Sequence, residues 1–256
     1  MEVDLGGSAG SYEGFLLARV RPPWPRDVTE LWPEHPAMVL AKAAGWRVQA
    51  VDGAGSDADG VVARFWRARD GHYESDEPTR HVLLCTHGAR DRCCGSLGTR
   101  LYSELSRQWD RPESLWRTSH LGGHRFAPTG LLLPEGTMWG YLDARSLTSI
   151  LDRTCSAIEA AQRYRGCTLL RDRRVQVADR AVFARAGWRW LDSPRSGSVL
   201  AFTDDEALVE VHSESDRYIV RLATRARLVP NPHCGSSRQE TAPLEAEIGV
   251  LEVTCS

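Results

Sequence analysis

Two short segments carry most of the side chains that could bind metal or react with oxidants. The first is CTHGARDRCCG, in which eight residues separate Cys85 from Cys94. The second is HLGGH, in which three residues, two of them glycine, separate His120 from His124. Thiolate sulfur and imidazole nitrogen are the ligands that zinc and iron prefer in proteins. The two pairs together therefore indicate a site for a metal ion or a metal cluster.

The HLGGH segment is predicted to be a tight loop and not part of a helix. Two central glycines would destabilise a helix by roughly 1 kcal/mol each relative to alanine. Adjacent glycines instead let the backbone bend sharply and approach a neighbour closely. A cluster needs such an approach, because its sulfurs accept hydrogen bonds from nearby N–H groups. The loop would then present both imidazoles on one side.

The residues alone leave the kind of site open. Two thiolates and two imidazoles fit tetrahedral zinc as well as iron, although zinc-binding cysteines usually stand closer together. Rieske centres also bind two irons with two cysteines and two histidines, but in alternating Cys–His pairs, and Cys85-Thr86-His87 imitates only one of these. A thiol redox enzyme using Cys93 or Cys94 is a third interpretation, but the Cys-x-x-Cys motif typical of such enzymes is absent.

The surrounding segments predict the elements that hold these residues. Residues 81–88 form an apolar run typical of a buried strand that ends where the cysteines begin. Residues 96–109 suggest a helix, 114–120 a short strand, 129–143 two strands joined by a Pro-Glu-Gly turn, and 145–163 an amphipathic helix. The resulting order is β–α–β–β–β–α, which predicts an α/β protein.

The pattern also predicts a division of the chain into four parts. Residues 1–13 are acidic and rich in glycine and serine, which indicates a disordered lead-in. Residues 14–77 read as an N-terminal α/β segment, and the polar stretch before position 81 marks its end. Residues 78–165 form the central domain. Residues 166–256 combine one helix with several short strands, an α+β segment.

Composition excludes several classes of protein. Of 256 residues, 42% are hydrophobic and 26% charged, as in ordinary folded domains, and a net charge of −2 gives no case for nucleic-acid or membrane partners. No apolar run approaches the roughly 20 residues that span a bilayer, and the N-terminus lacks the features of a secretory signal. Seven scattered cysteines argue against a disulfide framework. We therefore expect a cytoplasmic protein with reduced thiols.

The motifs of this chain resemble those of the sucrase/ferredoxin-like family. The resemblance is close over residues 78–165 and looser over 21–28 and 173–188, and three segments carry it: CTHGARDRCCG, SHLGGHRFAP and LLLPEGTMWGYLD. Members of this family are similar to thioredoxin-like ferredoxins, which hold a [2Fe–2S] cluster with two cysteine pairs. The resemblance implies a thioredoxin-like ferredoxin core with a mixed sheet over the central domain.

The resemblance also implies the ligands. It transfers the family's first cysteine pair to Cys85 and Cys94, and its second pair to His120 and His124, where histidines replace the cysteines. Cys93 remains an alternative to its neighbour, although the spacing selects Cys94. We expect the neighbouring residues to contact the ligands without binding the metal, or to form part of a docking surface for a partner: Thr86, His87, Arg90, Arg92, Cys93, Ser119 and Arg125.

The implied function is electron transfer with a redox partner protein, either a reductase or an electron acceptor. Histidine ligands carry less negative charge than thiolates and so raise the reduction potential. Each ligating imidazole also keeps one free ring nitrogen, so the midpoint potential is expected to fall as pH rises near or above neutrality. No catalytic residue is assigned, because the scattered carboxylates show no pair placed for glycoside hydrolysis. The chain is expected to be an electron carrier without a substrate of its own.

Overall fold

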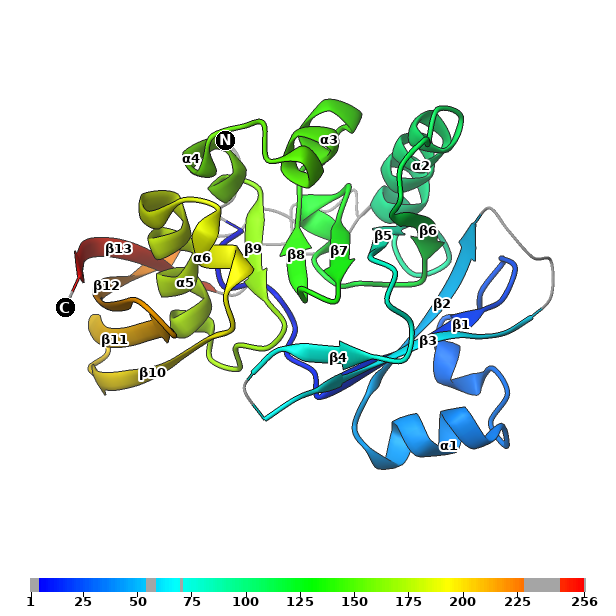
Figure 1. Ribbon diagram of the computed structural model, residues 1–256, viewed down its shortest axis with the longest axis horizontal. Helices are drawn as coiled ribbons and strands as arrows, with labels where there is room; N and C mark the ends of the chain where they lie inside the picture. Colours follow the sequence, from blue (N-terminus) through cyan, green and yellow to red (C-terminus); the bar gives the residue numbers. More distant parts are fainter. Residues whose placement is uncertain (1–4, 54–58, 70, 228–244, 256) are drawn as a thin grey trace.

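The computed structural model describes residues 5–53, 59–69, 71–227 and 245–255. In this part of the chain the strands form a nine-stranded mixed sheet and a four-stranded antiparallel sheet, with helices packed around both (Figure 1). The predicted α/β class is confirmed. The thioredoxin-like character of the core stays a prediction.

The larger sheet has the order β4-β3-β1-β2-β6-β5-β7-β8-β9. Its strands are β1 (Gly14–Arg19), β2 (Arg47–Gly53), β3 (Gly60–Arg67), β4 (Tyr73–Ser75), β5 (His81–Cys85), β6 (Ser114–Thr118), β7 (Gly130–Leu133), β8 (Thr137–Trp139) and β9 (Tyr164–Cys167). Strands from the predicted N-terminal and central parts therefore share one sheet.

The smaller sheet follows the chain order, with β10 (Arg195–Phe202), β11 (Glu206–Ser213), β12 (Arg217–Arg227) and β13 (Glu245–Cys255). The helices are α1 (Pro36–Ala43), α2 (Thr99–Ser106), α3 (Ala144–Asp152), α4 (Ala157–Ala161), α5 (Arg173–Ala186) and α6 (Arg189–Asp192). Single turns of other helical types are η1 (Val28–Glu30), η2 (Cys94–Gly98) and η3 (His124–Phe126). Helices α5 and α6 lie between β9 and the smaller sheet (Figure 1).

Strand β5 is buried along its whole length, as the apolar run predicts. Because side chains alternate along a strand, Val82 and Leu84 join the core beneath α2 and α3, whereas Leu83 and Cys85 face a second core with Trp116. β5 runs parallel to β6, and Cys85 pairs with Thr118. The carboxyl ends of both strands therefore meet at one edge of the sheet.

The amphipathic segment 145–163 is two helices, not the single helix that its periodicity predicts. Arg153 ends α3 in the left-handed conformation (φ 56°), and Ser156 starts α4 with a capping box to Glu159. A Ser-x-x-Glu motif marks such a helix start in sequence. The apolar periodicity continues across the break because both helices pack on the same core.

The N-terminal residues differ from the expected disordered lead-in. From Leu5 onward the described chain is packed, and Leu5 itself is fully buried. The Ser8 N–H donates to the carbonyl of Arg165, and the Tyr12 N–H donates to that of Thr168. Glycine and serine there serve close packing, because a Cβ at Gly7 would meet the backbone carbonyl of Arg173. Residues 1–4 lie outside the described part.

No helix among the described residues is both long and apolar enough to cross a bilayer.

Candidate metal centre

The two cysteines of the first motif come together at the carboxyl end of β5. Cys85 ends the strand, and Cys94 begins the turn η2 that leads into α2. Both side chains are completely buried. Glycine makes this approach possible, since a Cβ at Gly98 would overlap the carbonyl group of Cys85.

The two thiols influence one another directly. The hydrogen bond between them lowers the pKa of Cys85 and raises the pKa of Cys94. His120 and the backbone N–H groups of His87 and Leu121 also lower the pKa of Cys85 by hydrogen bonding to its sulfur. The pocket around Cys85 is therefore arranged to stabilise negative charge on sulfur.

The two histidines lie in the loop that follows β6. Gly122 and Gly123 both adopt positive φ angles, 83° and 69°, which favour glycine. The segment is thus a glycine loop, as the sequence predicts, and η3 begins at His124. Because β5 and β6 end at the same edge, the loop starts beside the thiols, and the imidazole of His120 hydrogen-bonds to Cys85.

Asp91 lies between the two imidazoles. The Nδ1 atom of His120 is 2.9 Å from Asp91 Oδ2, and that of His124 is 4.0 Å from Oδ1. Both nitrogens are buried and neither contact has hydrogen-bond geometry. Two imidazoles with unsatisfied ring nitrogens on one loop fit the donor set of a metal group.

Exposure distinguishes the two pairs. The histidine side chains keep 17% and 21% of their surface exposed, whereas neither Cys85 nor Cys94 has any. A hollow of about 280 Å³ opens beside His120, and the arginines in its wall are Arg26, Arg47 and Arg90. The histidine side therefore faces solvent through a basic opening.

His87 supports the loop from behind. It is buried, its Nδ1 accepts the backbone N–H of His120 at 3.2 Å, and its ring meets the edge of Trp24. Burial lowers the pKa of His87, which favours the neutral ring that this acceptor role requires. His87 therefore supports the backbone of the histidine loop.

The other residues expected near the ligands have mixed placements. Ser119 does not donate to sulfur, since its hydroxyl donates to Gln49 Oε1 at 2.9 Å. Arg90 donates to the carbonyl of Arg26, and Arg125 lies 4.9 Å from the centre of the Phe126 ring. The remaining positions are near the site: the backbone N–H of Thr86 donates to the Thr118 carbonyl, and Arg92 is exposed. Cys93 is half-buried beside Cys94 and is disulfide-bonded, so the expectation of reduced thiols is wrong for this residue.

Sequence reasoning missed two charged groups at the site. Asp91 stands three residues before Cys94, inside the first motif, and its position between two candidate ligands was the available signal. Arg165 lies far along the chain, and no local pattern marks it. Its guanidinium nevertheless reaches the histidine loop, where it donates to the carbonyl of Gly122 at 3.0 Å.

The fit to a metal group can be judged from the donors. In the described part of the chain, no three His, Cys, Asp or Glu side chains converge on a point where one metal ion could bind. A two-iron cluster requires a different arrangement, because each iron binds a separate pair of protein ligands. A buried thiol pair beside an imidazole pair fits that requirement.

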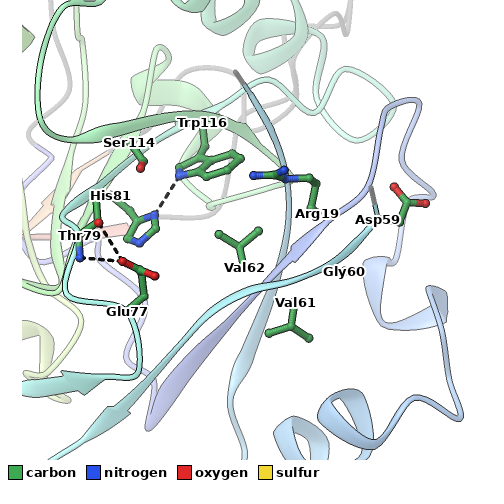
Figure 2. Close-up of a pocket in the computed structure, with 10 residues that line it drawn as sticks. All are labelled: Arg19, Asp59, Gly60, Val61, Val62, Glu77, Thr79, His81, Ser114 and Trp116. Atoms are coloured by element: carbon green, nitrogen blue, oxygen red, sulfur yellow. Dashed lines mark hydrogen bonds between the residues drawn. The ribbon is translucent and has the colours of Figure 1, made fainter. Parts of the chain in front are cut away.

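A separate pocket lies at the other end of β5. It has a volume of about 540 Å³ and is lined by His81, Trp116 and Arg19 among others (Figure 2). The indole N–H of Trp116 donates to His81 Nδ1 at 2.9 Å, and Arg19 lies 5.0 Å from the centre of the Trp116 ring. His81 and Cys85 occupy opposite ends of the strand, so this pocket is distinct from the thiol site.

The fold and the site together define an α/β protein with a mixed Cys/His metal-site candidate. The sucrase/ferredoxin-like family model matches residues 28–166, more than half of the chain. The chain belongs to the sucrase/ferredoxin-like family. No curated protein and no solved structure matches this chain.

Proposed function

We propose that this protein transfers electrons through a [2Fe–2S] cluster bound by Cys85, Cys94, His120 and His124. One observation carries the proposal: two buried thiols in contact lie directly beside a glycine loop that holds two imidazoles. Family membership supports a redox role in general terms. When bound, such a cluster supplies one-electron redox chemistry.

The chain's own residues have distinct roles in this proposal. The backbone N–H groups of His87 and Leu121 stabilise charge on the Cys85 sulfur. Asp91 lies close enough to the Nδ1 atoms of His120 and His124 that it would accept their hydrogens after a small rotation of the rings, as carboxylates beside metal-bound histidines commonly do. Burial of the thiols excludes water from the sulfur side of the site.

The two alternative functions fit less well. A thiol redox enzyme using Cys93 or Cys94 needs an accessible free thiol, but Cys94 has no exposed surface and Cys93 is disulfide-bonded. A single zinc ion needs four donors around one point, and no three donors in the described residues converge in this way.

We further propose that the partner is a protein with an acidic contact surface, which docks on the histidine side. The histidines are the solvent-facing part of the site, so an electron has the shortest path to a partner there. Arg26, Arg47 and Arg90 surround the hollow beside His120 and would attract carboxylates. Asp27 offsets this charge only in part. Hydrogen bonds from Thr29 lower the pKa of Asp27, and Arg90 and Arg47 add a smaller contribution.

The first test is the visible absorption and reduced-state EPR spectrum of protein purified without oxygen. We expect visible absorption and a low average g-value typical of mixed Cys/His ligation, which in His120→Cys moves toward values typical of four-cysteine ferredoxins. Cys94→Ser should abolish the absorption, whereas the adjacent variant Cys93→Ser should keep it. A colourless protein with stoichiometric zinc, expressed under iron-replete conditions, would overturn the proposal.

A further inference from the structure

The most unusual charge near the site is the guanidinium of Arg165. Arg165 lies in β9, is 1% exposed and is therefore completely removed from water. Its nitrogens donate to neutral oxygens only: Nε to Ser8 Oγ at 3.0 Å, Nη2 to the Ser8 carbonyl at 2.6 Å and Nη1 to the Gly122 carbonyl at 3.0 Å.

None of the ion pairs among the described residues includes this cation: the neighbouring carboxylate Asp91 faces His120, and the buried carboxylate Asp179 pairs with Arg195. Burial lowers the pKa of Arg165 to about 10, so it remains charged at neutral pH. A buried charge without a counter-ion is strongly destabilising. The nearby groups that can carry compensating negative charge include the Cys85 and Cys94 sulfurs, which act electrostatically on Arg165.

We infer that Arg165 is the buried counter-charge of the sulfur site and raises its reduction potential. This inference rests on the proposed function, because the thiolates are fully formed only when they bind metal. A fixed positive charge in a medium of low polarity favours the addition of an electron nearby.

Arg165 also positions the histidine loop. It donates a hydrogen bond to the carbonyl of Gly122, the residue that stands midway between His120 and His124 in the sequence. The guanidinium fills the space beside Gly123, where a Cβ would collide with it. Through Ser8 the same side chain ties the N-terminal segment to the loop.

The test is a redox titration of the purified, cluster-loaded protein, followed by its visible absorption, for wild type, Arg165→Gln, Arg165→Lys and Arg163→Gln. Arg163→Gln is the matched control, because it also removes a guanidinium. Arg163 lies two residues away from Arg165 in the sequence and is partly exposed. We expect a more negative midpoint potential in Arg165→Gln, and values near wild type in Arg165→Lys and Arg163→Gln. Equal shifts in the Lys and Gln variants of Arg165 would overturn the role of charge.

A second variant covers the case in which Arg165→Gln does not fold. Ser8→Asp keeps the guanidinium and places a carboxylate beside it, so the midpoint potential should again become more negative. An unchanged midpoint potential would contradict the inference, provided that the Ser8→Asp protein folds and that its new carboxylate pairs with the Arg165 guanidinium.

Thermal unfolding gives a readout that does not depend on electron transfer. Loading should raise the melting temperature less in Arg165→Gln than in wild type or Arg163→Gln, because the variant lacks the cation that the thiolates compensate. An equal rise in melting temperature on loading in Arg165→Gln and wild type would count against the inference. If wild-type protein binds no cluster at all, the proposed function itself fails, which separates the two outcomes.

Discussion

Asp91 is the residue whose role follows most directly from its place between the two imidazoles. Carboxylates that orient metal-bound histidines typically contribute about 10–100-fold in metal affinity. We therefore expect Asp91→Asn to lose its cluster on dilution or chelation faster than wild type by a factor in this range. The decay of visible absorption with a chelator present measures it.

The exposed carboxylate of Asp27 provides the control for this prediction. Asp27 lines the hollow beside His120, but its carboxylate accepts a hydrogen bond from Thr29 and does not contact the histidines. Asp27→Asn should therefore retain the cluster as wild type does. Equal decay in both variants would mean that Asp91 has no special part in holding the imidazoles.

The buried side chain of His81 should make the stability of the protein depend on pH. Burial lowers the pKa of His81 below its ordinary value of 6.5. Because the unfolded chain then binds the proton more readily than the folded protein, the free energy of unfolding should decrease as pH falls below about 6.5. Urea unfolding of metal-free protein at pH 5 and pH 7.5 measures this decrease.

A variant isolates the contribution of His81. His81→Gln keeps an acceptor for the Trp116 N–H but does not titrate, so its stability should fall less between the two pH values. His35→Asn preserves the N-cap of α1 and serves as the exposed control. An identical pH dependence in wild type and His81→Gln would assign the effect to other groups.

At the scale of elements, the glycine loop after β6 determines where the histidines lie. Gly122 and Gly123 share the left-handed conformation, but only Gly123 lacks room for a Cβ, because Arg165 fills that space. Alanine at either position costs about 1–2 kcal/mol in backbone strain. Gly123→Ala should in addition displace the guanidinium and lose most of the cluster.

Gly122→Ala is the matched comparison, since nothing lies within 4 Å of its added Cβ. Iron content and visible absorption per mole of protein, together with the melting temperature, compare the two variants. Similar cluster content in both would show that the contact with Arg165 does not matter.

At the scale of the whole molecule, one buried polar network joins the central part to the smaller sheet. Asp179 of α5 accepts hydrogen bonds from Tyr164 of β9, Trp190 of α6 and Arg195 of β10, at 2.7, 2.8 and 2.8 Å. The carboxylate thus connects four elements that lie side by side (Figure 1). Burial and the Tyr164–Asp179 contact raise the pKa of Tyr164, which keeps it a neutral donor.

Asp179→Asn should destabilise the protein by about 3–5 kcal/mol, because it leaves the buried Arg195 cation without its counter-charge. Denaturant unfolding measures the loss. The exposed pair Arg153–Asp192 provides the control, and Asp192→Asn should cost no more than about 1 kcal/mol. A small effect of Asp179→Asn would mean that the smaller sheet does not depend on this network.

The sequence by itself determined the local features of the site. The apolar run before Cys85 specified a buried strand, and adjacent glycines specified a loop between His120 and His124, because period and backbone freedom are local properties. The family resemblance, which the family match confirms, came from the same short motifs. The roles of the four candidate ligands stay a prediction, as does the division into domains.

The tertiary structure decided what no local pattern contains. The parallel pairing of β5 with β6 places the histidine loop beside the thiols, and it depends on contacts between strands 33 positions apart in sequence, as for Cys85 and Thr118. Packing likewise orders the segment after Leu5 and brings the Arg165 charge to the loop. Such placements arise from long-range burial, so the residue that we infer to tune this site lies outside both motifs.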